Sequence, residues 1–391
     1  MRSAPEGLLV SQTKVNPWDV GELPSHSGES HNPVGVARPL RILAQPAFRL
    51  RERNPYTWQL ATSLQALGAQ VCEFSKAELL RGGHDLWHVH WPEGNLNSPR
   101  MARAMRRSAG LLGLIQLSRA RGTKILWTIH NLAAHERLHP RLEGWFWSIF
   151  IQQLDGYISL SRTGQKLALE RFPQLRQLPG FVIPHGHYRG VYPNTVTREA
   201  AREVLGILND ATVLLYLGQI RGYKNVPGLI QMFRRLDAPR LLLLVAGQPT
   251  DATLERAVRD AGAGDSRVRL SLSFLPDEAL QLYLNAADLL VLPYHEILNS
   301  GTAILGLSFD RPVLVPAKGA LKELQDLVGP AWVRTFEGAL SGEALSEALA
   351  WARTVGRAPR APLDALCWNT VSRATIAAYE SILGERSGAA E

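Results

Sequence analysis

The stretch Val291-Leu-Pro-Tyr-His-Glu-Ile-Leu-Asn-Ser-Gly-Thr-Ala-Ile-Leu-Gly306 decides how the second half of this chain folds. Residues 288–292 form an apolar run of strand length, and Pro293 ends it. Residues 299–302 follow with side chains that cap helices, and an apolar helical pattern covers residues 303–309. A strand, a polar loop and a helix start together form an anion site, because the first N–H groups of a helix have no partner within it.

A second stretch with the same design lies upstream, Gly218-Gln-Ile-Arg-Gly-Tyr-Lys-Asn225, directly after an apolar strand at residues 211–217. Gly218 permits close approach to the backbone, and two cations follow it. An ordinary capped helix and a solvated basic loop are the alternatives for the two stretches. Because strand ends of a parallel sheet meet at one edge, we expect a shared diphosphate site instead. Its residues would be Gly218, Arg221, Lys224, Asn299, Ser300, Gly301 and Thr302.

Length and composition predict a globular protein of two domains. The chain has 391 residues, of which 46% are hydrophobic and 20% charged. Its only cysteines, Cys72 and Cys367, lie far apart without the spacing of metal ligands, which fits a reducing, cytoplasmic location. Residues 1–37 lack the apolar segment of a signal peptide and are expected to form a disordered leader. No apolar run reaches about 18 residues, so a membrane-spanning helix is not expected.

The formal net charge of +8 is unevenly distributed. Residues 1–190 hold 23 lysines and arginines against 13 aspartates and glutamates, whereas residues 191–391 hold 20 against 22. A basic half suits nucleic acid, an anionic membrane or a phosphate-bearing substrate. No nucleic-acid-binding motif occurs, so the last two partners are preferred.

Short apolar strands alternate with helices in both halves, which predicts two doubly wound parallel sheets of Rossmann type. The strands expected in the first half are 40–44, 70–74, 85–90, 123–130, 156–159 and 181–184. Those expected in the second half are 211–217, 240–246, 268–272, 288–292 and 311–315. The predicted domains are 38–190 and 191–366, each with one Rossmann-like sheet. A C-terminal helix is predicted in 367–391, and one of its possible positions is against the first domain.

Histidines gather at the strand ends of the first half. Alternation along the third strand puts His88 and His90 on one face, and we expect His88 to pack beneath the sheet. A carboxylate close to imidazoles in a cleft is interpreted as a general base or a sugar clamp, because neither HExxH nor a metal triad of fixed spacing occurs. His185-Gly-His-Tyr188 lies between the halves. This segment can serve as a hinge or form part of the site, and the sequence leaves both roles open.

Four stretches together give the chain a resemblance to a known family, over residues 38–385. They are His88-Val-His-Trp-Pro-Glu93, Thr128-Ile-His-Asn-Leu-Ala-Ala-His-Glu136, Gly218-Gln-Ile-Arg-Gly-Tyr-Lys224 and Pro293-Tyr-His-Glu-Ile-Leu-Asn-Ser-Gly-Thr302. The chain resembles nucleotide-sugar glycosyltransferases of the two-Rossmann GT-B fold. Among these it is most similar to the bacterial exopolysaccharide β-mannosyltransferases that build xanthan-like repeat units on a polyprenyl-diphosphate carrier.

This resemblance implies roles for the donor side. Arg221 and Lys224 would hold the donor diphosphate, residues 299–302 would offer it backbone donors, and His130 would contact the donor sugar. The large retaining GT-B families carry two glutamates eight positions apart, where this chain has Ile297 and Leu305, with Glu296 offset. The departure favours inversion, which needs a base on the acceptor side. The candidates for that base are Glu93 and Glu136, with His135 behind them.

The resemblance also implies partners for the acceptor side. His90, Asn131, His185 and His187 are candidates for the acceptor side or the hinge. No cofactor is implied, since the nucleotide sugar is a substrate. No metal is implied either, because Arg221, Lys224 and the helix end would neutralise the leaving diphosphate in place of magnesium. The basic helix 101–121 and the aromatic stretch 145–151 suit a membrane interface, so we expect a peripheral location on the inner face of the cell membrane. Burial against the sheet is the alternative for Trp145 and Trp147.

Three hypotheses for function follow. The preferred one is an inverting transferase that moves a hexose, with mannose from GDP-mannose as the candidate, to a lipid-linked or polysaccharide acceptor. A retaining transferase that uses Glu296 is the second. A non-catalytic protein that binds nucleotide sugars is the third. A NAD-dependent oxidoreductase is disfavoured, because no GxGxxG follows a strand.

Overall fold

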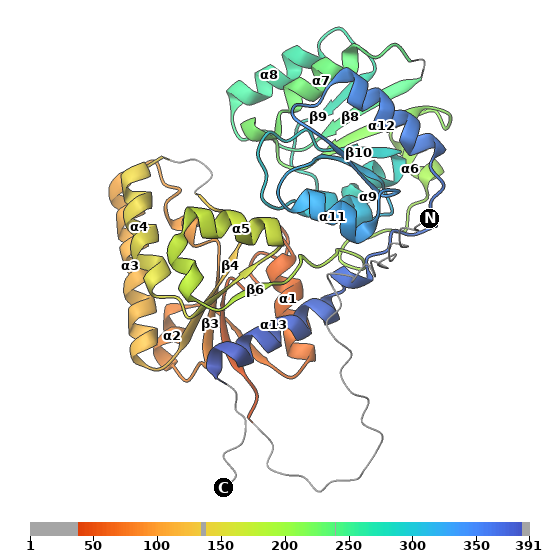
Figure 1. The fold of residues 1–391 in the computed structure, drawn as a ribbon. Helices are drawn as coiled ribbons and strands as arrows, with labels where there is room; N and C mark the ends of the chain where they lie inside the picture. The colour runs from red at the N-terminus through yellow and green to blue at the C-terminus, as the bar shows by residue number, and fades with distance from the viewer. Residues whose placement is uncertain (1–37, 134–137, 239, 385–391) are drawn as a thin grey trace, which may run out of the picture. The chain divides into compact units, whose positions relative to one another are not determined.

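The computed structural model of the protein describes residues 38–133, 138–238 and 240–384. From Pro39 onward these residues belong to one compact unit, which contains two six-stranded sheets (Figure 1). Every strand pair in both sheets is parallel. The predicted α/β class with two doubly wound sheets is thereby confirmed, while the domain boundary at residue 190 stays a prediction.

The first sheet has the order β2-β1-β3-β4-β5-β6. Its strands are β1 (Arg41–Gln45), β2 (Gln70–Glu73), β3 (Leu86–His90), β4 (Lys124–Ile129), β5 (Gly156–Ser159) and β6 (Gly180–Val182). Each overlaps a predicted strand. The inner strands β3, β4 and β5 are mostly apolar and buried on both faces of the sheet, whereas the edge strands β2 and β6 are only partly buried. The strand order reverses between β1 and β3, and ligands bind at such points in open α/β sheets.

Helices cover both faces of the first sheet. They are α1 (Tyr56–Ala66), α2 (Lys76–Arg81), α3 (Met101–Ala120), α4 (Pro140–Gln152) and α5 (Arg162–Arg171), with 3-10 turns η1 (Pro92–Asn95) and η2 (Pro173–Gln177). Trp87 and Val89 of β3 pack into the cluster that α3 and α4 complete. The C-terminal helix α13 (Trp368–Leu383) packs against α1 on the other face, where Tyr379 is fully buried.

The second sheet has the order β12-β11-β10-β7-β8-β9. Its strands are β7 (Thr212–Leu217), β8 (Leu241–Ala246), β9 (Val268–Ser271), β10 (Leu289–Val291), β11 (Val313–Pro316) and β12 (Val333–Phe336). β7 pairs with both β8 and β10, so the order reverses between β7 and β10. The two stretches predicted to bind a diphosphate follow β7 and β10, and therefore leave the sheet at neighbouring positions of this reversal.

The helices of the second sheet include several that the sequence patterns did not identify. The helices of this sheet are α6 (Arg198–Val204), α7 (Val226–Arg234), α8 (Ala252–Gly262), α9 (Asp277–Ala286), α10 (Gly301–Ser308), α11 (Ala320–Val328) and α12 (Gly342–Thr354), with 3-10 turns η3 (Gly222–Lys224) and η4 (Asp364–Leu366). Those that the patterns did not identify are α7, α8, α11 and α12. In the part of the chain that the structure describes, none of the helices combines the length and apolarity needed to cross a bilayer.

A buried guanidinium ties α6 to the strands that carry the candidate site. Arg202 is fully buried and donates hydrogen bonds to the carbonyls of Ala286 (3.1 Å) and Asn209 (2.7 Å). It also donates to Asp288 Oδ2 at 2.9 Å, and the same oxygen accepts from the Val213 N–H at 2.7 Å. The guanidinium can be buried because its charge is paired and hydrogen-bonded. Asp288 directly precedes β10 and Val213 belongs to β7, so the shared Asp288 carboxylate fixes the starts of the two strands relative to each other.

Candidate functional site

The start of α10 provides the first part of the site. Ser300 caps the helix, and its Oγ accepts a hydrogen bond from the Ala303 N–H at 3.3 Å. A Cβ built on Gly301 would lie 3.0 Å from Tyr188 Oη and 3.8 Å from His185 Nε2. The bare backbone of the helix start therefore faces these two side chains, and its N–H groups carry the positive end of the helix dipole.

The loop after β7 approaches the same helix start. Gly218 has a φ of +112°, which favours glycine, and a Cβ there would lie 3.3 Å from Thr302 Oγ1 and 3.8 Å from Lys224 Nζ. The turn η3 brings Lys224 back toward the strand end, and its Nζ lies 5.4 Å from the Tyr294 ring centroid. The structure thus brings the two predicted diphosphate-binding stretches together.

Lys224 lies in a cationic environment. Burial, and secondly the Arg221 guanidinium, lower the pKa of Lys224 to about 8. Among the residues that the structure describes, no carboxylate pairs with this ammonium. Arg221 donates from Nε to Gln219 Oε1 at 3.1 Å, so its guanidinium is held at the same loop. A half-buried ammonium beside a helix start can bind an anion, whose negative charge would stabilise the charged form of the lysine.

The histidines of the first sheet form a stacked, buried group. The rings of His88 and His90 lie 4.2 Å apart, as the predicted common face requires. His90 Nδ1 lies 3.0 Å from His130 Nε2, and Trp91 stacks on His130 at 4.2 Å. Trp91 adopts the left-handed region with a φ of +49°, so the chain turns sharply at the end of β3.

These imidazoles are neutral. Burial lowers the pKa of His88 to about 3 and of His185 to about 4, and it lowers those of His90 and His130 well below their usual value. They can therefore donate or accept hydrogen bonds to a sugar, but they do not carry charge near neutral pH.

His88 has a structural environment. Its Nδ1 lies 2.8 Å from Tyr379 Oη of α13, and its Nε2 lies 2.7 Å from Thr128 Oγ1. Both ring nitrogens are therefore occupied within the protein, as expected for a histidine beneath the sheet.

Glu93 lies in η1, directly after β3, and is 2% exposed. Its Oε1 accepts a hydrogen bond from Asn131 Nδ2 at 2.7 Å. Burial raises the pKa of Glu93 to about 7, against the hydrogen bond from Asn131 and with a further contribution from the charge of Glu143. A carboxyl group that titrates near neutrality can exchange a proton with a substrate.

Glu143 is a residue that the sequence analysis missed. It lies in α4, is buried, and accepts a hydrogen bond from Trp147 Nε1 at 3.3 Å. The only signal available was one carboxylate within an aromatic helix, which indicates no partner. Packing of α4 against the sheet decides that its charge acts on Glu93.

One hydrogen bond joins the two groups of residues. Asn299 Nδ2, in the loop before α10, donates to the carbonyl of His130 at 3.2 Å. His130 and Asn131 are adjacent, so the loop before α10 and the Glu93 carboxyl are connected through Asn299 and Asn131. A second connection links the backbone N–H of Arg162 in α5 with Glu323 Oε2 of α11 at 2.9 Å.

The remaining predicted site residues are placed differently. His185 bonds through Nδ1 to the Gly186 carbonyl (2.7 Å) and through Nε2 to Tyr188 Oη (3.3 Å), so it lies beside Gly301. The carbonyl of His187 accepts from Trp368 Nε1 at 2.7 Å, which fastens the crossover to α13. Glu296 is exposed on the loop before α10. His135 and Glu136 lie outside the described residues.

Comparison with known proteins identifies the family. Residues 197–305 match the family described as "Glycosyl transferases group 1". The chain is 32% identical over 337 residues to the GDP-mannose:glycolipid 4-beta-D-mannosyltransferase of Xanthomonas campestris pv. campestris, over 86% of this chain and 91% of the relative.

Solved structures share the fold. Sucrose-phosphate synthase (tll1590) from Thermosynechococcus elongatus aligns with a TM-score of 0.60 at 18% identity, over 88% of this chain and 96% of that one. Anabaena Alr3699/HepE in complex with UDP and glucose aligns with a TM-score of 0.57 at 14% identity, over 88% and 97%. The fold is that of the GT-B glycosyltransferases. Because the chain matches the Xanthomonas relative over most of both chains, and because residues 197–305 match the family, the chain belongs to the group 1 glycosyltransferase family.

Proposed function

We propose that this glycosyltransferase transfers mannose from GDP-mannose to a lipid-linked or polysaccharide acceptor, with inversion at the anomeric carbon and without a metal ion. The observation that carries the proposal is the hydrogen bond from Asn299 to the His130 carbonyl. It links the loop before α10 to the segment in which Asn131 bonds the buried, titratable Glu93 carboxyl. The relative from Xanthomonas acts on GDP-mannose and a glycolipid by name, which supports the choice of donor and acceptor.

The donor diphosphate would lie between Lys224, Arg221 and the start of α10. Lysine, arginine and unpaired helix N–H groups supply positive charge where the leaving diphosphate gains negative charge, so they can do the work of a divalent ion. That UDP is bound by the structurally similar Anabaena protein supports a nucleotide diphosphate in this fold. We expect Mg²⁺ or Mn²⁺ to leave the transfer rate unchanged.

Inversion would proceed by a single displacement. The acceptor hydroxyl oxygen forms a bond to the anomeric carbon as the bond to the GDP oxygen breaks, and the hydroxyl proton passes to a carboxylate. Glu93 is our candidate for this base, since its pKa of about 7 suits proton acceptance near neutrality. Glu136 remains the alternative base, with His135 behind it.

A retaining mechanism has less support in this chain. Glu296 is exposed, and position 305, where the retaining families have their second carboxylate, holds a leucine packed in the core of the second sheet. NMR of the product separates the two mechanisms: inversion gives a β-mannoside from GDP-α-mannose, and an α-mannoside would refute it.

We further propose that the first sheet's helices dock on an anionic membrane surface. α3 and α4 lie side by side (Figure 1), and their starts are joined by His139 Nε2 and the Ser98 carbonyl, 2.7 Å apart. Apolar side chains are exposed around these starts: Met101, Met105, Leu138 and Trp145. Exposed arginines surround them: Arg100, Arg103, Arg106, Arg107 and Arg141. Apolar side chains ringed by cations suit the interface of an anionic bilayer.

The aromatic residues of α4 divide between core and surface. Trp147 and Phe146 are buried in the core of the first sheet, whereas Trp145 is 41% exposed. Trp145 is therefore the tryptophan available to a membrane, and a lipid-linked acceptor held there would approach the Glu93 side of the site.

The proposal is tested first by thermal shift with GDP, UDP, dTDP and ADP and their sugars. A ligand that binds only the folded state raises the apparent stability, so GDP and GDP-mannose should give the largest shift. Transfer to a polyprenyl-linked glycan is then measured by chromatography. A larger shift with another nucleotide would refute the donor, and donor binding without turnover on any acceptor would favour the non-catalytic hypothesis.

A further inference from the structure

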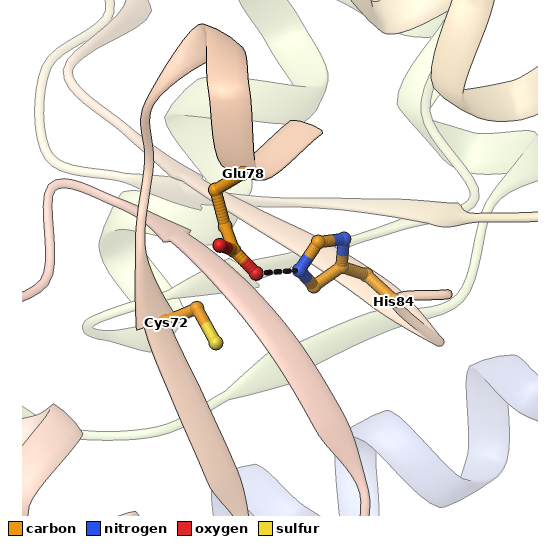
Figure 2. A group of neighbouring side chains, drawn as sticks. All are labelled: Cys72, Glu78 and His84. Atoms are coloured by element: carbon orange, nitrogen blue, oxygen red, sulfur yellow. Dashed lines mark hydrogen bonds and ion pairs between the residues drawn. The ribbon is translucent and has the colours of Figure 1, made fainter. Parts of the chain in front are cut away.

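A group of potential metal ligands lies at the edge of the first sheet, away from the residues of the transferase site. Cys72 belongs to β2, Glu78 to α2, and His84 to the loop before β3. The thiol sulfur, a carboxylate oxygen and an imidazole nitrogen all lie within 4.8 Å of one another. Figure 2 shows the three side chains pointing toward a common space from three different elements.

Hydrogen bonding accounts for part of this arrangement. Glu78 Oε1 lies 3.1 Å from His84 Nε2, and Glu78 Oε2 pairs with Arg81. Neither contact involves Cys72, whose half-buried thiol points at the pair and forms no disulfide. These two contacts therefore explain the positions of Glu78 and His84, but they do not explain why the Cys72 thiol lies beside them.

We propose that Cys72, Glu78 and His84 bind a zinc ion. Thiolate, imidazole and carboxylate are the three ligand types that proteins use for Zn²⁺, whereas Mg²⁺ and Ca²⁺ require oxygen ligands. Three protein ligands leave the fourth tetrahedral position for water. This site goes beyond the proposed transfer reaction, since none of its residues belongs to the donor or acceptor side.

Binding exchanges protons for the metal in a balanced way. The S–H bond of Cys72 breaks as the sulfur–zinc bond forms, and the proton passes to solvent. In the metal-free protein the neutral imidazole of His84 donates its Nε2 proton to Glu78 Oε1. On binding, Nε2 releases this proton to solvent and Nδ1 takes one up, so that the Nε2 lone pair faces the ion. The contact between Nε2 and Glu78 Oε1 is then replaced by one bond from each atom to zinc.

Neighbouring groups hold the ligands in place. The Arg81 guanidinium orients the Glu78 carboxylate through its second oxygen. The backbone carbonyl of His84 accepts from Thr123 Oγ1 at 3.0 Å, and the residue is only 6% exposed. Such outer contacts reduce the reorganisation that binding requires. Because Arg41 and Arg81 bring positive charge near the site, we expect zinc to bind only with the Cys72 thiolate formed.

The expected role is structural. Within the described residues, β2 is an edge strand of its sheet, and its pairing partner is β1. A zinc ion would join β2, α2 and the approach to β3, and so tie together three segments at this edge of the sheet. Because the three ligands come together only in the folded chain, zinc binding would stabilise the folded state.

The test uses the untagged full-length chain and its two cysteines. Metal-free protein is titrated with Co²⁺ and Zn²⁺, and Cys72→Ser is compared with Cys367→Ser as the matched control. We expect roughly one zinc per chain, thiolate-to-cobalt absorption, and a rise in melting temperature with zinc. Cys367→Ser should retain all three, and Cys72→Ser should lose the thiolate absorption and the thermal shift.

Equal melting temperatures of the metal-free proteins show that the serine variants are folded. His84→Gln provides an independent check and should weaken zinc binding at least about tenfold. Cobalt absorption without a thiolate component, or zinc stabilisation that survives in Cys72→Ser, would overturn the proposal. Either result leaves the transferase proposal untouched, because donor binding involves other residues.

Discussion

Lys224 makes a specific prediction at the scale of a single residue. Its pKa of about 8 in the free protein reflects burial and Arg221, and a bound diphosphate would raise it. Below pH 8 the ammonium is charged in both states, so the affinity for GDP should be constant. Above pH 8 binding must take up a proton, and the affinity should fall by up to about tenfold per pH unit. Calorimetry of GDP binding between pH 7 and 10 measures this.

The substitution Lys224→Met should weaken GDP binding at pH 7 by roughly ten- to a hundredfold, because a charged hydrogen bond is lost. It should also remove the decline above pH 8. Lys322→Met, which changes an exposed lysine of α11, is the control and should keep both. A decline that persists unchanged in Lys224→Met would assign it to another group.

Glu93 links turnover to stability. Its pKa is about 7 in the folded protein against the usual 4.5, so the folded state favours the protonated carboxyl. Stability is therefore lost as pH rises from 4.5 to about 7, by roughly 3 kcal/mol when the group is fully ionised. Glu93→Gln should be more stable than the natural protein at pH 8 and equally stable at pH 4. Urea unfolding at the two pH values checks this.

The same variant should lower turnover by about 10²- to 10⁴-fold if Glu93 is the base. The natural enzyme should gain activity as pH rises through about 7. Glu143→Gln removes a neighbouring negative charge and should move this rise to lower pH without abolishing turnover. Full activity of Glu93→Gln would transfer the role of base to Glu136.

At the scale of the elements, the start of α10 depends on the absence of a side chain at Gly301. Alanine there would place a Cβ 3.0 Å from Tyr188 Oη, so the helix start or the tyrosine must move. We expect Gly301→Ala to weaken GDP binding about tenfold, since the N–H groups shift from the diphosphate. Binding is measured by calorimetry and stability by thermal unfolding.

Gly113→Ala in α3 is the control, because nothing lies within 4 Å of its added Cβ. It should stabilise the helix by about 0.5–1 kcal/mol and leave GDP binding unchanged. Unchanged affinity of Gly301→Ala for GDP would show that the diphosphate lies elsewhere.

Elements differ in how far the sequence predicts them. Strands such as β8 are continuous apolar runs, and burial on both faces explains why they are recognised. Helices α7 and α11 were not predicted, and both begin without a side-chain cap, after Asn225 and Gly319. β12 contains only four residues, two of them Arg334 and Thr335. Its assignment depends on pairing with β11, which no local pattern indicates.

For the whole molecule, we expect binding to vesicles that contain anionic lipid. Trp145→Ala should lower the partition coefficient by about tenfold, because one exposed aromatic side chain no longer enters the interface. Raising the salt concentration should weaken binding, since exposed arginines are screened. Vesicle co-sedimentation measures both effects.

Phe274→Ala is the matched control, as Phe274 is 63% exposed on the second sheet's side of the chain. It should bind vesicles as the natural protein does. Equal losses for Trp145→Ala and Phe274→Ala would mean that binding is not localised at α3 and α4.

Local sequence patterns were enough to predict the two parallel sheets, a capped helix start within residues 299–302, the cationic loop with Lys224 and the shared face of His88 and His90. These features are local, because strand period, cap chemistry and charge act within a few residues of the chain. The contacts between distant residues become visible in the folded chain: Asn299 with His130, Gly301 beside His185, Glu143 acting on Glu93, and Cys72 with Glu78 and His84. Such contacts depend on how helices and loops pack on the sheets. The hydrophobic periodicity of a segment shows which of its faces is buried, but it does not show which other segment that face contacts.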